Sequence, residues 1–337
     1  MTKIYNTYNV GLNPSDIAIT NNGKYAYVTN SNNYGITGSD SVTVLNLCKG
    51  IPKTTIYDAS FNSPYRIAID SCDRYAYVCN SSTPSYTGAT GTVSIIDLKS
   101  NTVTGVINGF DGPGAIAIKN NTTAYITNYG ASGGVGSGNG NSISVVNLIT
   151  KQIITTIIVN QAPSALKLYK NKLYVTNYTT GLPGTGTLNI IDTNTNTILN
   201  TITGFFGPFD LAICKNTAYV TNFGSNNFEP YGTYISVVDL RSNTIIQQIQ
   251  VGIQPAGIAL NNNYIFVSNY NSLYANPEYQ NLTYGESTIN VICIKNNQVI
   301  KTIPIGQTGT IITLSPCRDK LFVCKYVQNT IIELRSD

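Results

Sequence analysis

The stretch YAYVTN at residues 25–30 returns along the chain in slightly altered form. The later copies are YAYVCN at 75–80, TAYITN at 123–128, KLYVTN at 172–177, TAYVTN at 217–222, YIFVSN at 264–269 and KLFVCK at 320–325. Successive copies end 45 to 56 residues apart, a spacing that is typical of repeat folds. The sequence therefore predicts seven structural units of one kind.

Three further segments recur around each copy. A proline and a short apolar run come before it, as in PSDIAI at 14–19, and a run such as SVTVLNL at 41–47 comes after it. A last segment rich in Ile, Thr and Val closes the unit, as in KQIITTIIV at 151–159. All four segments are short, roughly alternating, and rich in β-branched or aromatic residues, which indicates strands. Each unit is expected to contain four strands.

Four antiparallel strands in each repeat favour an all-β, seven-bladed β-propeller, whose closure into a ring leaves few exposed sheet edges. We expect a single domain over residues 1–337, with blades that begin near residues 11, 61, 110, 160, 205, 252 and 306. The seventh unit ends at TIIELR, 330–335, without a fourth strand, whereas KIYNTYNVG at 3–11 matches the fourth-strand pattern of VIKTIPIG at 299–306. Residues 3–10 are therefore expected to complete blade seven.

The run of YVTN phrases, with a proline ahead of most copies and a VID-type third strand, resembles the YVTN-repeat β-propeller family, whose architecture is WD40-like. The resemblance covers essentially the whole chain. The seventh unit departs from it, with Lys325 in place of Asn and Gly309 in place of Pro. The resemblance implies the fold and leaves the activity open, because the family includes surface-layer modules, binding proteins and lactonase-like enzymes.

Histidine is missing from all 337 residues. Its absence removes the usual general base, the Ser-His and Cys-His nucleophile pairs, and the commonest metal ligand. The sequence contains no CxxC pair for a zinc site. The glycine-rich stretch GGVGSGNG at 133–140 lacks both the lysine of a P-loop and the GxGxxG spacing. We therefore expect no metal, no cofactor and no nucleotide site.

The cysteine pattern bears on the compartment. Seven cysteines, an odd number, include several at positions that hold Thr or Val in other repeats. This usage suits a reducing compartment such as the cytoplasm, or a particle such as a virion that is assembled there. The first residues carry one charge and no apolar core segment, so no signal peptide is expected, and no stretch is long enough to span a membrane.

Charged residues on the first strands are the candidates for catalysis. The position two after the proline holds Asp16, Arg66 and Asp210, and Asp16 and Arg66 come from adjacent blades, so an ion pair is expected near the channel mouth. Lys167 stands where four other blades have alanine. These four residues define a hydrolase alternative of the lactonase-like kind, although the same charges also suit a solvated channel. The aspartates that end third strands, Asp97, Asp192 and Asp239, are expected to cap turns, and the last Asn of each YVTN phrase is expected to bond to loop backbone.

Aromatic residues mark one face of the disc. We call this the top face: it carries the entry to each first strand and the loops between the second and third strands. An aromatic residue follows the YVTN phrase in five consecutive blades, and the loops add further tyrosines; the candidate binding residues are Tyr129, Tyr178, Phe223, Tyr231, Tyr270, Tyr274, Tyr279, Tyr284 and Tyr326. Tyrosine-rich and asparagine-rich loops on a rigid frame resemble paratopes. This pattern favours a non-enzymatic binding or scaffold protein, as a surface or virion component, with a protein or glycan partner.

The opposite, bottom face collects positive charge. Its turns lie between the first and second strands and between the third and fourth strands. They carry Lys24, Lys49, Arg74, Lys99, Lys119, Lys151, Lys170, Lys172, Lys215, Arg241, Lys295, Arg318 and Lys320. The net charge of +4 is therefore expected to be unevenly distributed, with an anionic partner on the bottom face. Nucleic acid is a second alternative, weakened because aromatic residues do not alternate with these lysines.

Overall fold

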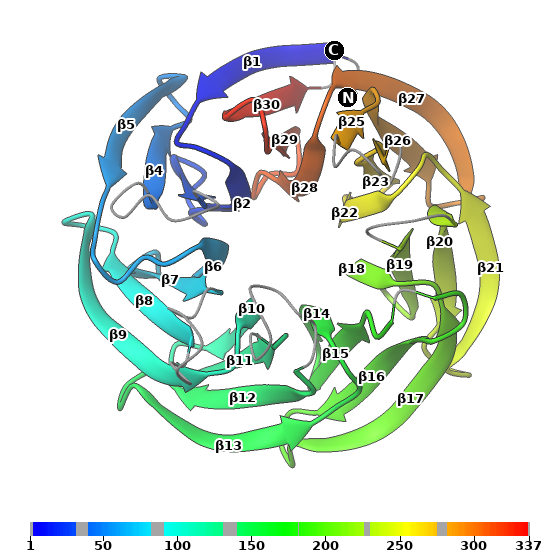
Figure 1. The fold of residues 1–337 in the computed structure, drawn as a ribbon, viewed down its shortest axis with the longest axis horizontal. Helices are drawn as coiled ribbons and strands as arrows, with labels where there is room; N and C mark the ends of the chain where they lie inside the picture. Colours follow the sequence, from blue (N-terminus) through cyan, green and yellow to red (C-terminus); the bar gives the residue numbers. More distant parts are fainter. Residues whose placement is uncertain are drawn as a thin grey trace.

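The computed structural model describes residues 3–31, 40–81, 91–130, 140–180, 182–225, 230–274 and 282–335, with only the backbone described at 272–274 and 282–284. This part of the chain forms seven four-stranded antiparallel sheets and one two-stranded sheet. Figure 1 shows the seven sheets arranged as blades around a central channel. The all-β, seven-bladed β-propeller is confirmed. Within the described residues, no helix is long and apolar enough to cross a membrane.

The four strand positions of a blade repeat around the ring. The innermost strands are β2 (Pro14–Ile19), β6 (Pro64–Ile69), β10 (Pro113–Asn120), β14 (Pro163–Tyr169), β18 (Pro208–Cys214), β22 (Pro255–Leu260) and β28 (Gly309–Leu314). The second strands are β3 (Tyr25–Asn30), β7 (Tyr75–Asn80), β11 (Thr123–Asn128), β15 (Lys172–Asn177), β19 (Thr217–Gly224), β23 (Tyr264–Asn269) and β29 (Lys320–Lys325). The third strands are β4 (Ser41–Asn46), β8 (Gly91–Asp97), β12 (Ser142–Asn147), β16 (Gly186–Asp192), β20 (Tyr231–Asp239), β26 (Ser287–Cys293) and β30 (Thr330–Arg335). The outermost strands are β5 (Ile51–Ile56), β9 (Thr102–Phe110), β13 (Gln152–Ile158), β17 (Thr197–Phe205), β21 (Thr244–Gln250), β27 (Gln298–Gly306) and β1 (Lys3–Asn9), and a small hairpin of β24 (Ser272–Tyr274) and β25 (Leu282–Tyr284) extends blade six.

The ring is closed by the first strand of the chain. Strand β1 pairs antiparallel with β30, from Lys3 opposite Arg335 to Asn9 opposite Thr330. Figure 1 shows β1 as the outer strand of the blade that also contains β28, β29 and β30. Tyr8 of β1 is 2% exposed. The predicted completion of blade seven is confirmed.

The hydrophobic core lies between the blades. Side chains of a strand alternate between the two faces of its sheet, and in a propeller both faces are covered by neighbouring blades. The second strands are accordingly buried along almost their whole length, as in β3, where every residue after Tyr25 is buried. One core cluster joins Tyr27 and Val42 of blade one to Ile67 and Val78 of blade two. The outermost strands alternate instead, because solvent reaches them from the rim.

Every innermost strand is irregular at its top end. The pairing register shifts directly after the first residue of β2, β6, β10, β14, β18, β22 and β28. The residue before each of these positions has a positive φ: Asn13, Ser63, Gly112, Ala162, Gly207, Gln254 and Thr308, with φ between 49° and 60°. A bulge of this kind redirects the side chains on either side of it. The bulges therefore help to determine which side chains face the top of the channel.

Candidate functional site

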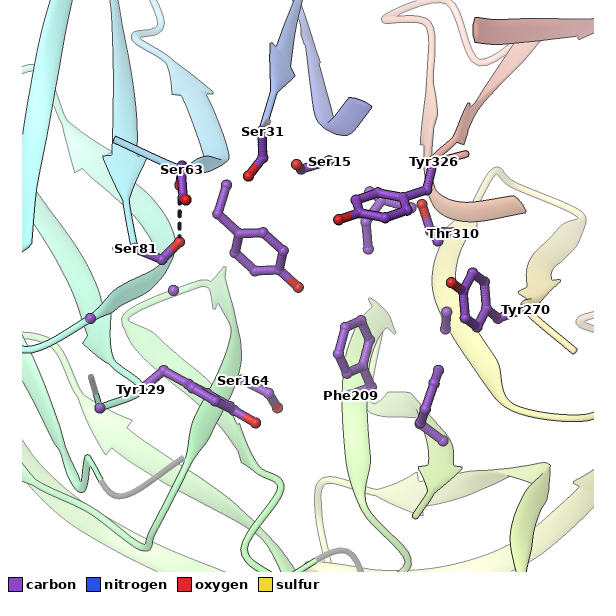
Figure 2. Close-up of a pocket in the computed structure, with 17 residues that line it drawn as sticks. Ser15, Ser31, Ser63, Ser81, Tyr129, Ser164, Phe209, Tyr270, Thr310 and Tyr326 are labelled. Carbon is purple, nitrogen blue, oxygen red and sulfur yellow. Dashed lines mark hydrogen bonds between the residues drawn. The ribbon is translucent and has the colours of Figure 1, made fainter. Parts of the chain in front are cut away.

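The top of the central channel opens into a cavity of about 380 Å³. All seven blades contribute to its wall, through two positions that recur in the repeat. The first is the residue after each proline or after Gly309: Ser15, Tyr65, Gly114, Ser164, Phe209, Ala256 and Thr310. The second is the residue after the YVTN phrase: Ser31, Ser81, Tyr129, Phe223, Tyr270 and Tyr326. With Ser63, Gly112, Gly130 and Ile311, these residues form what we call the mouth, shown in Figure 2.

Backbone geometry brings the two positions together in every blade. The N–H of the residue after the phrase donates to the carbonyl oxygen of the left-handed residue before the proline, as from Tyr129 to Gly112 at 3.0 Å and from Tyr270 to Gln254 at 3.0 Å. The same hydrogen bond occurs in all seven blades. It fixes the end of the second strand beside the start of the first. The backbone therefore positions two side chains per blade, whatever their chemical type.

Gly207 shows why one of these left-handed positions requires glycine. Its φ is 51°, and an added Cβ would lie 2.6 Å from the carbonyl oxygen of Gly224. Because five equivalent positions hold non-glycine residues at positive φ, the mouth is surrounded by a conformation that side chains rarely adopt.

Aromatic rings form one side of the mouth. The ring centroids of Phe209 and Phe223 lie 5.3 Å apart, and those of Phe223 and Tyr270 lie 6.4 Å apart, in tilted arrangements. Buried Ala162 and Tyr178 pack against them, together with Ala256 of the wall. The rings therefore form a supported surface rather than a set of loose side chains.

Hydroxyl groups form the other side. Figure 2 places Ser31, Ser63 and Ser81 across the mouth from Phe209 and Tyr270, with Ser15 beside Tyr326. Ser15 Oγ donates to the carbonyl oxygen of Asn13 at 3.2 Å, and Ser81 Oγ donates to that of Ser63 at 3.3 Å. Since these hydroxyl protons are directed to the backbone, the oxygen lone pairs are available to accept hydrogen bonds.

The predicted ion pair is present, but outside the wall of the mouth. Arg66 Nη1 lies 3.9 Å from Asp16 Oδ1, and both side chains are largely buried. The two Asp16 carboxylate oxygens accept backbone N–H groups of Ile17 at 2.9 Å and Ile67 at 3.0 Å. Burial raises the pKa of Asp16, and Arg66 opposes that shift. Asp16 thus links blade one to blade two.

Asp210 makes the equivalent link between blades five and six. Its Oδ1 accepts the N–H of Leu211 at 2.9 Å and its Oδ2 accepts that of Ile258 at 3.3 Å. Lys167, the fourth candidate of the hydrolase alternative, is exposed on β14 and does not line the mouth. The structure brings Asp16 and Arg66 together without placing any of the four candidates on the cavity wall.

The predicted binding residues divide into three groups. Tyr129, Phe223, Tyr270 and Tyr326 line the mouth. Tyr178 is 7% exposed and packs behind the aromatic side, where its hydroxyl donates to the carbonyl oxygen of Gly224. Tyr231 begins β20, half-buried, and is not part of the wall. The side chains of Tyr274 and Tyr284, and the whole of Tyr279, lie outside the described residues.

Two aromatic residues of the mouth were not predicted. Tyr65 and Phe209 follow Pro64 and Pro208 directly, whereas the sequence analysis placed the channel-lining residue one position later. The bulge explains the difference: it turns the first residue after the proline into the mouth and the second toward the next blade. Burial raises the pKa of Tyr65 and raises that of Tyr129 to about 12, so both phenols stay protonated and able to donate at neutral pH.

On the bottom face, the third-strand aspartates cap turns as predicted. Asp97 Oδ1 accepts the N–H groups of Lys99 at 2.8 Å and Ser100 at 3.0 Å, which lowers its pKa. Asp192 and Asp239 accept N–H groups two residues later in the same way. A shallow cavity of about 230 Å³ on this face is lined by Lys170, Lys172 and Lys215 among others. Within the described ranges, no cluster of three or more Cys, Asp or Glu side chains could hold a metal ion.

Comparison with known proteins establishes the fold. The chain is similar to hydrazine synthase of Kuenenia stuttgartiensis, with a TM-score of 0.76 and 14% identity over 96% of each chain. No protein-family model and no curated protein sequence matches this chain. At this identity the likeness concerns the seven-bladed architecture alone.

Proposed function

We propose that this protein is a non-enzymatic binding protein that engages a protein or glycan partner at the mouth of its central channel. The observation that carries the proposal is the composition of the wall: six aromatic side chains and six hydroxyl side chains converge from seven blades, and no lining residue is charged. Aromatic groups with a polar tip provide contact area at low entropic cost, and hydroxyl groups provide adaptable hydrogen bonds. The YVTN-type repeat supports placing the chain among the propellers that serve as surface, virion or scaffold components.

The position of the charged residues supports binding over hydrolysis. A nucleophile or general base needs to reach the reacting atom within hydrogen-bond distance. Asp16 and Asp210 instead direct their carboxylate oxygens to backbone N–H groups of the next blade. The hydrolase alternative would therefore need a substrate group that passes below the wall residues of the mouth.

Labelled protein on arrays of glycans and of peptides tests the proposal. The mouth variant combines Tyr270→Ser and Tyr326→Ser, and the control variant combines Tyr57→Ser and Tyr264→Ser, which change exposed tyrosines away from the cavity. We expect the parent and the control to retain the same ligands and the mouth variant to lose them. Ligands that survive in the mouth variant, with the variant shown to be folded by its thermal transition, would refute the proposal. Turnover of a lactone that disappears in Asp210→Asn and survives in the mouth variant would favour the hydrolase.

A second site is favoured by the lysine-lined cavity of the bottom face. Lys170, Lys172 and Lys215 line it with Tyr169, Tyr174 and Asp192, and the carboxylate of Asp192 accepts the backbone N–H of Asn194. Lys170 Nζ lies 5.4 Å from the centroid of the Tyr169 ring, which holds the ammonium group at the surface. We propose that this face docks on an anionic partner while the mouth remains accessible.

A further inference from the structure

Building on the proposed function, we infer that the mouth binds the terminal, uncharged sugar ring of a glycan. The wall has a serine-rich part and an aromatic part, although Tyr65 of blade two and Thr310 of blade seven interrupt this division. Blades one and two supply Ser15, Ser31, Ser63 and Ser81, which we call the serine arc. Blades five, six and seven supply Phe209, Phe223, Tyr270 and Tyr326, which we call the aromatic arc. A ligand that fits both arcs needs one apolar face and one edge rich in hydrogen-bonding groups.

The aromatic arc supplies a stacking surface. Phe209, Phe223 and Tyr270 form a continuous row with centroid spacings of 5.3 and 6.4 Å. The buried side chains behind the row keep it in place without the ligand. Little conformational entropy is therefore lost when an apolar face is laid against it. The C–H face of a pyranose ring meets this requirement.

The serine arc supplies acceptors for hydroxyl groups. Ser15 and Ser81 direct their protons to backbone carbonyls, so their oxygens present lone pairs. The wall holds no Lys, Arg, Asp or Glu, and the nearest ion pair, Asp16 with Arg66, lies outside it. Asp16 also accepts the backbone N–H of Ile67. A charged ligand would lose its hydration without a compensating partner. The mouth therefore favours a neutral polyol edge.

The shape of the wall favours the terminal sugar of a glycan as the ligand. Because described residues of all seven blades contribute, the wall surrounds the cavity. Its volume of about 380 Å³ is at the small end of the range for ligand pockets. A terminal sugar residue can enter such an opening along the channel axis.

The direct test uses the whole chain with methyl glycosides of neutral hexoses and N-acetylhexosamines, followed by saturation-transfer NMR and calorimetry. We expect at least one neutral glycoside to bind, with transfer strongest at the C–H groups of one ring face. Tyr270→Phe keeps the ring and should retain affinity within about threefold, while Tyr270→Ser should weaken it about tenfold or more. Ser31→Ala should weaken it by roughly fivefold, and Tyr57→Ser, on the outer rim, should leave it unchanged.

A cyclic oligosaccharide tests the requirement for an end. Linear and cyclic chains of whichever sugar binds are compared, and only the linear chain should bind. Equal binding of both would overturn the end-on geometry. Binding of tetramethylammonium or of a uronic acid, with no neutral glycoside bound, would overturn the sugar class and leave the mouth as a binding site. If no ligand on the glycan and peptide arrays depends on the mouth residues, the proposed function fails as well.

Discussion

At the scale of single residues, the repeated phrase is a structural device. The last Asn of the phrase ties its own blade together: Asn177 Nδ2 donates to Thr187 Oγ1 at 3.0 Å and to Asn189 Oδ1 at 2.7 Å. In blade five Asn222 Oδ1 also accepts the N–H of Phe206, in the segment that enters the blade, at 2.9 Å. The prediction that this Asn bonds to loop backbone is confirmed there. The side chain is buried in every blade that has it, which explains why the phrase identifies the fold and not a ligand.

In blade seven Lys325 stands where the other blades have this Asn, and it makes the free energy of unfolding depend on pH. Lys325 is 3% exposed, and its Nζ donates to the carbonyl oxygen of Ile305 at 2.5 Å. Burial lowers the pKa of Lys325 from 10.5 to about 8. Between these two values the unfolded chain binds more protons than the folded protein, so stability due to this residue rises with pH across that window.

Lys325→Asn should therefore stabilise the protein at pH 7, because no buried ammonium group remains, and the advantage should shrink as the pH approaches 10. Urea unfolding of the parent and the variant at a series of pH values measures the difference. Lys301→Asn, at an exposed position on β27, is the matched control for the loss of one positive charge. A difference that stayed constant or grew up to pH 10 would contradict the assignment.

At the scale of elements, the closure of the ring depends on β1. This strand covers the outer edge of β30, and Tyr8 anchors it: its ring lies 6.5 Å from that of Phe322, and its hydroxyl donates to Glu333 Oε2 at 2.5 Å. Tyr5 of the same strand is 58% exposed and packs against Arg335 on the outside. Substituting each tyrosine in turn therefore measures how much the buried face and the exposed face of β1 contribute to stability.

Tyr8→Ala should destabilise the protein by about 3–5 kcal/mol, the usual cost of removing a buried aromatic ring, because β1 then loses its contact with the core. Tyr5→Ala should cost less than about 1 kcal/mol. Unfolding in urea gives both values, and size-exclusion chromatography shows whether a loosened β1 exposes the edge of β30 to another chain. Equal effects of the two substitutions would mean that β1 is held by its backbone pairing alone.

The sequence predicted these elements well because strand position is encoded in local pattern. Period-two alternation and the shared outline of residues 3–11 and 299–306 were enough to predict β1 in blade seven. The same reasoning did not identify the residue directly after the proline as part of the mouth, since a bulge there leaves no trace in the alternation of so short a strand. Tyr65 and Phe209 were missed for that reason. The residue that follows each YVTN phrase was predicted to lie at the top face. In five blades this residue is aromatic, and four of these five aromatic residues line the mouth.

At the scale of the whole molecule, a seven-fold repeat carries an asymmetric site. The same backbone hydrogen bond occurs at the mouth in every blade, but the side chains differ: serines predominate in blades one and two, beside Tyr65, and aromatic rings predominate in blades five to seven, beside Thr310. A likeness of fold at 14% identity shows that this architecture persists while nearly all side chains differ. Under the proposed function, two positions per blade would determine specificity at the mouth, whereas three lysines line the cavity of the bottom face.

The lysines of the bottom face predict how the binding of a polyanion depends on salt concentration. Lys170 and Lys215 adopt positive φ, so Asn replaces them without strain, and Lys170→Asn, Lys172→Gln and Lys215→Asn together remove three charges from the bottom cavity. With random-sequence DNA as a polyanion probe, binding should be weak and salt-sensitive. The slope of log K against log salt should fall by about two to three in this variant.

Lys3→Gln, Lys53→Gln and Lys301→Gln provide the control, because they lower the net charge from +4 by the same amount at the outermost strands. We expect a smaller change of slope there, since dispersed charges on the rim do not meet one surface together. Ligand binding at the mouth should be unchanged in both triple variants, which are distant in the repeat from the mouth positions. Equal loss of slope in the two variants would show that total charge, rather than its concentration on the bottom face, governs attraction to anionic surfaces.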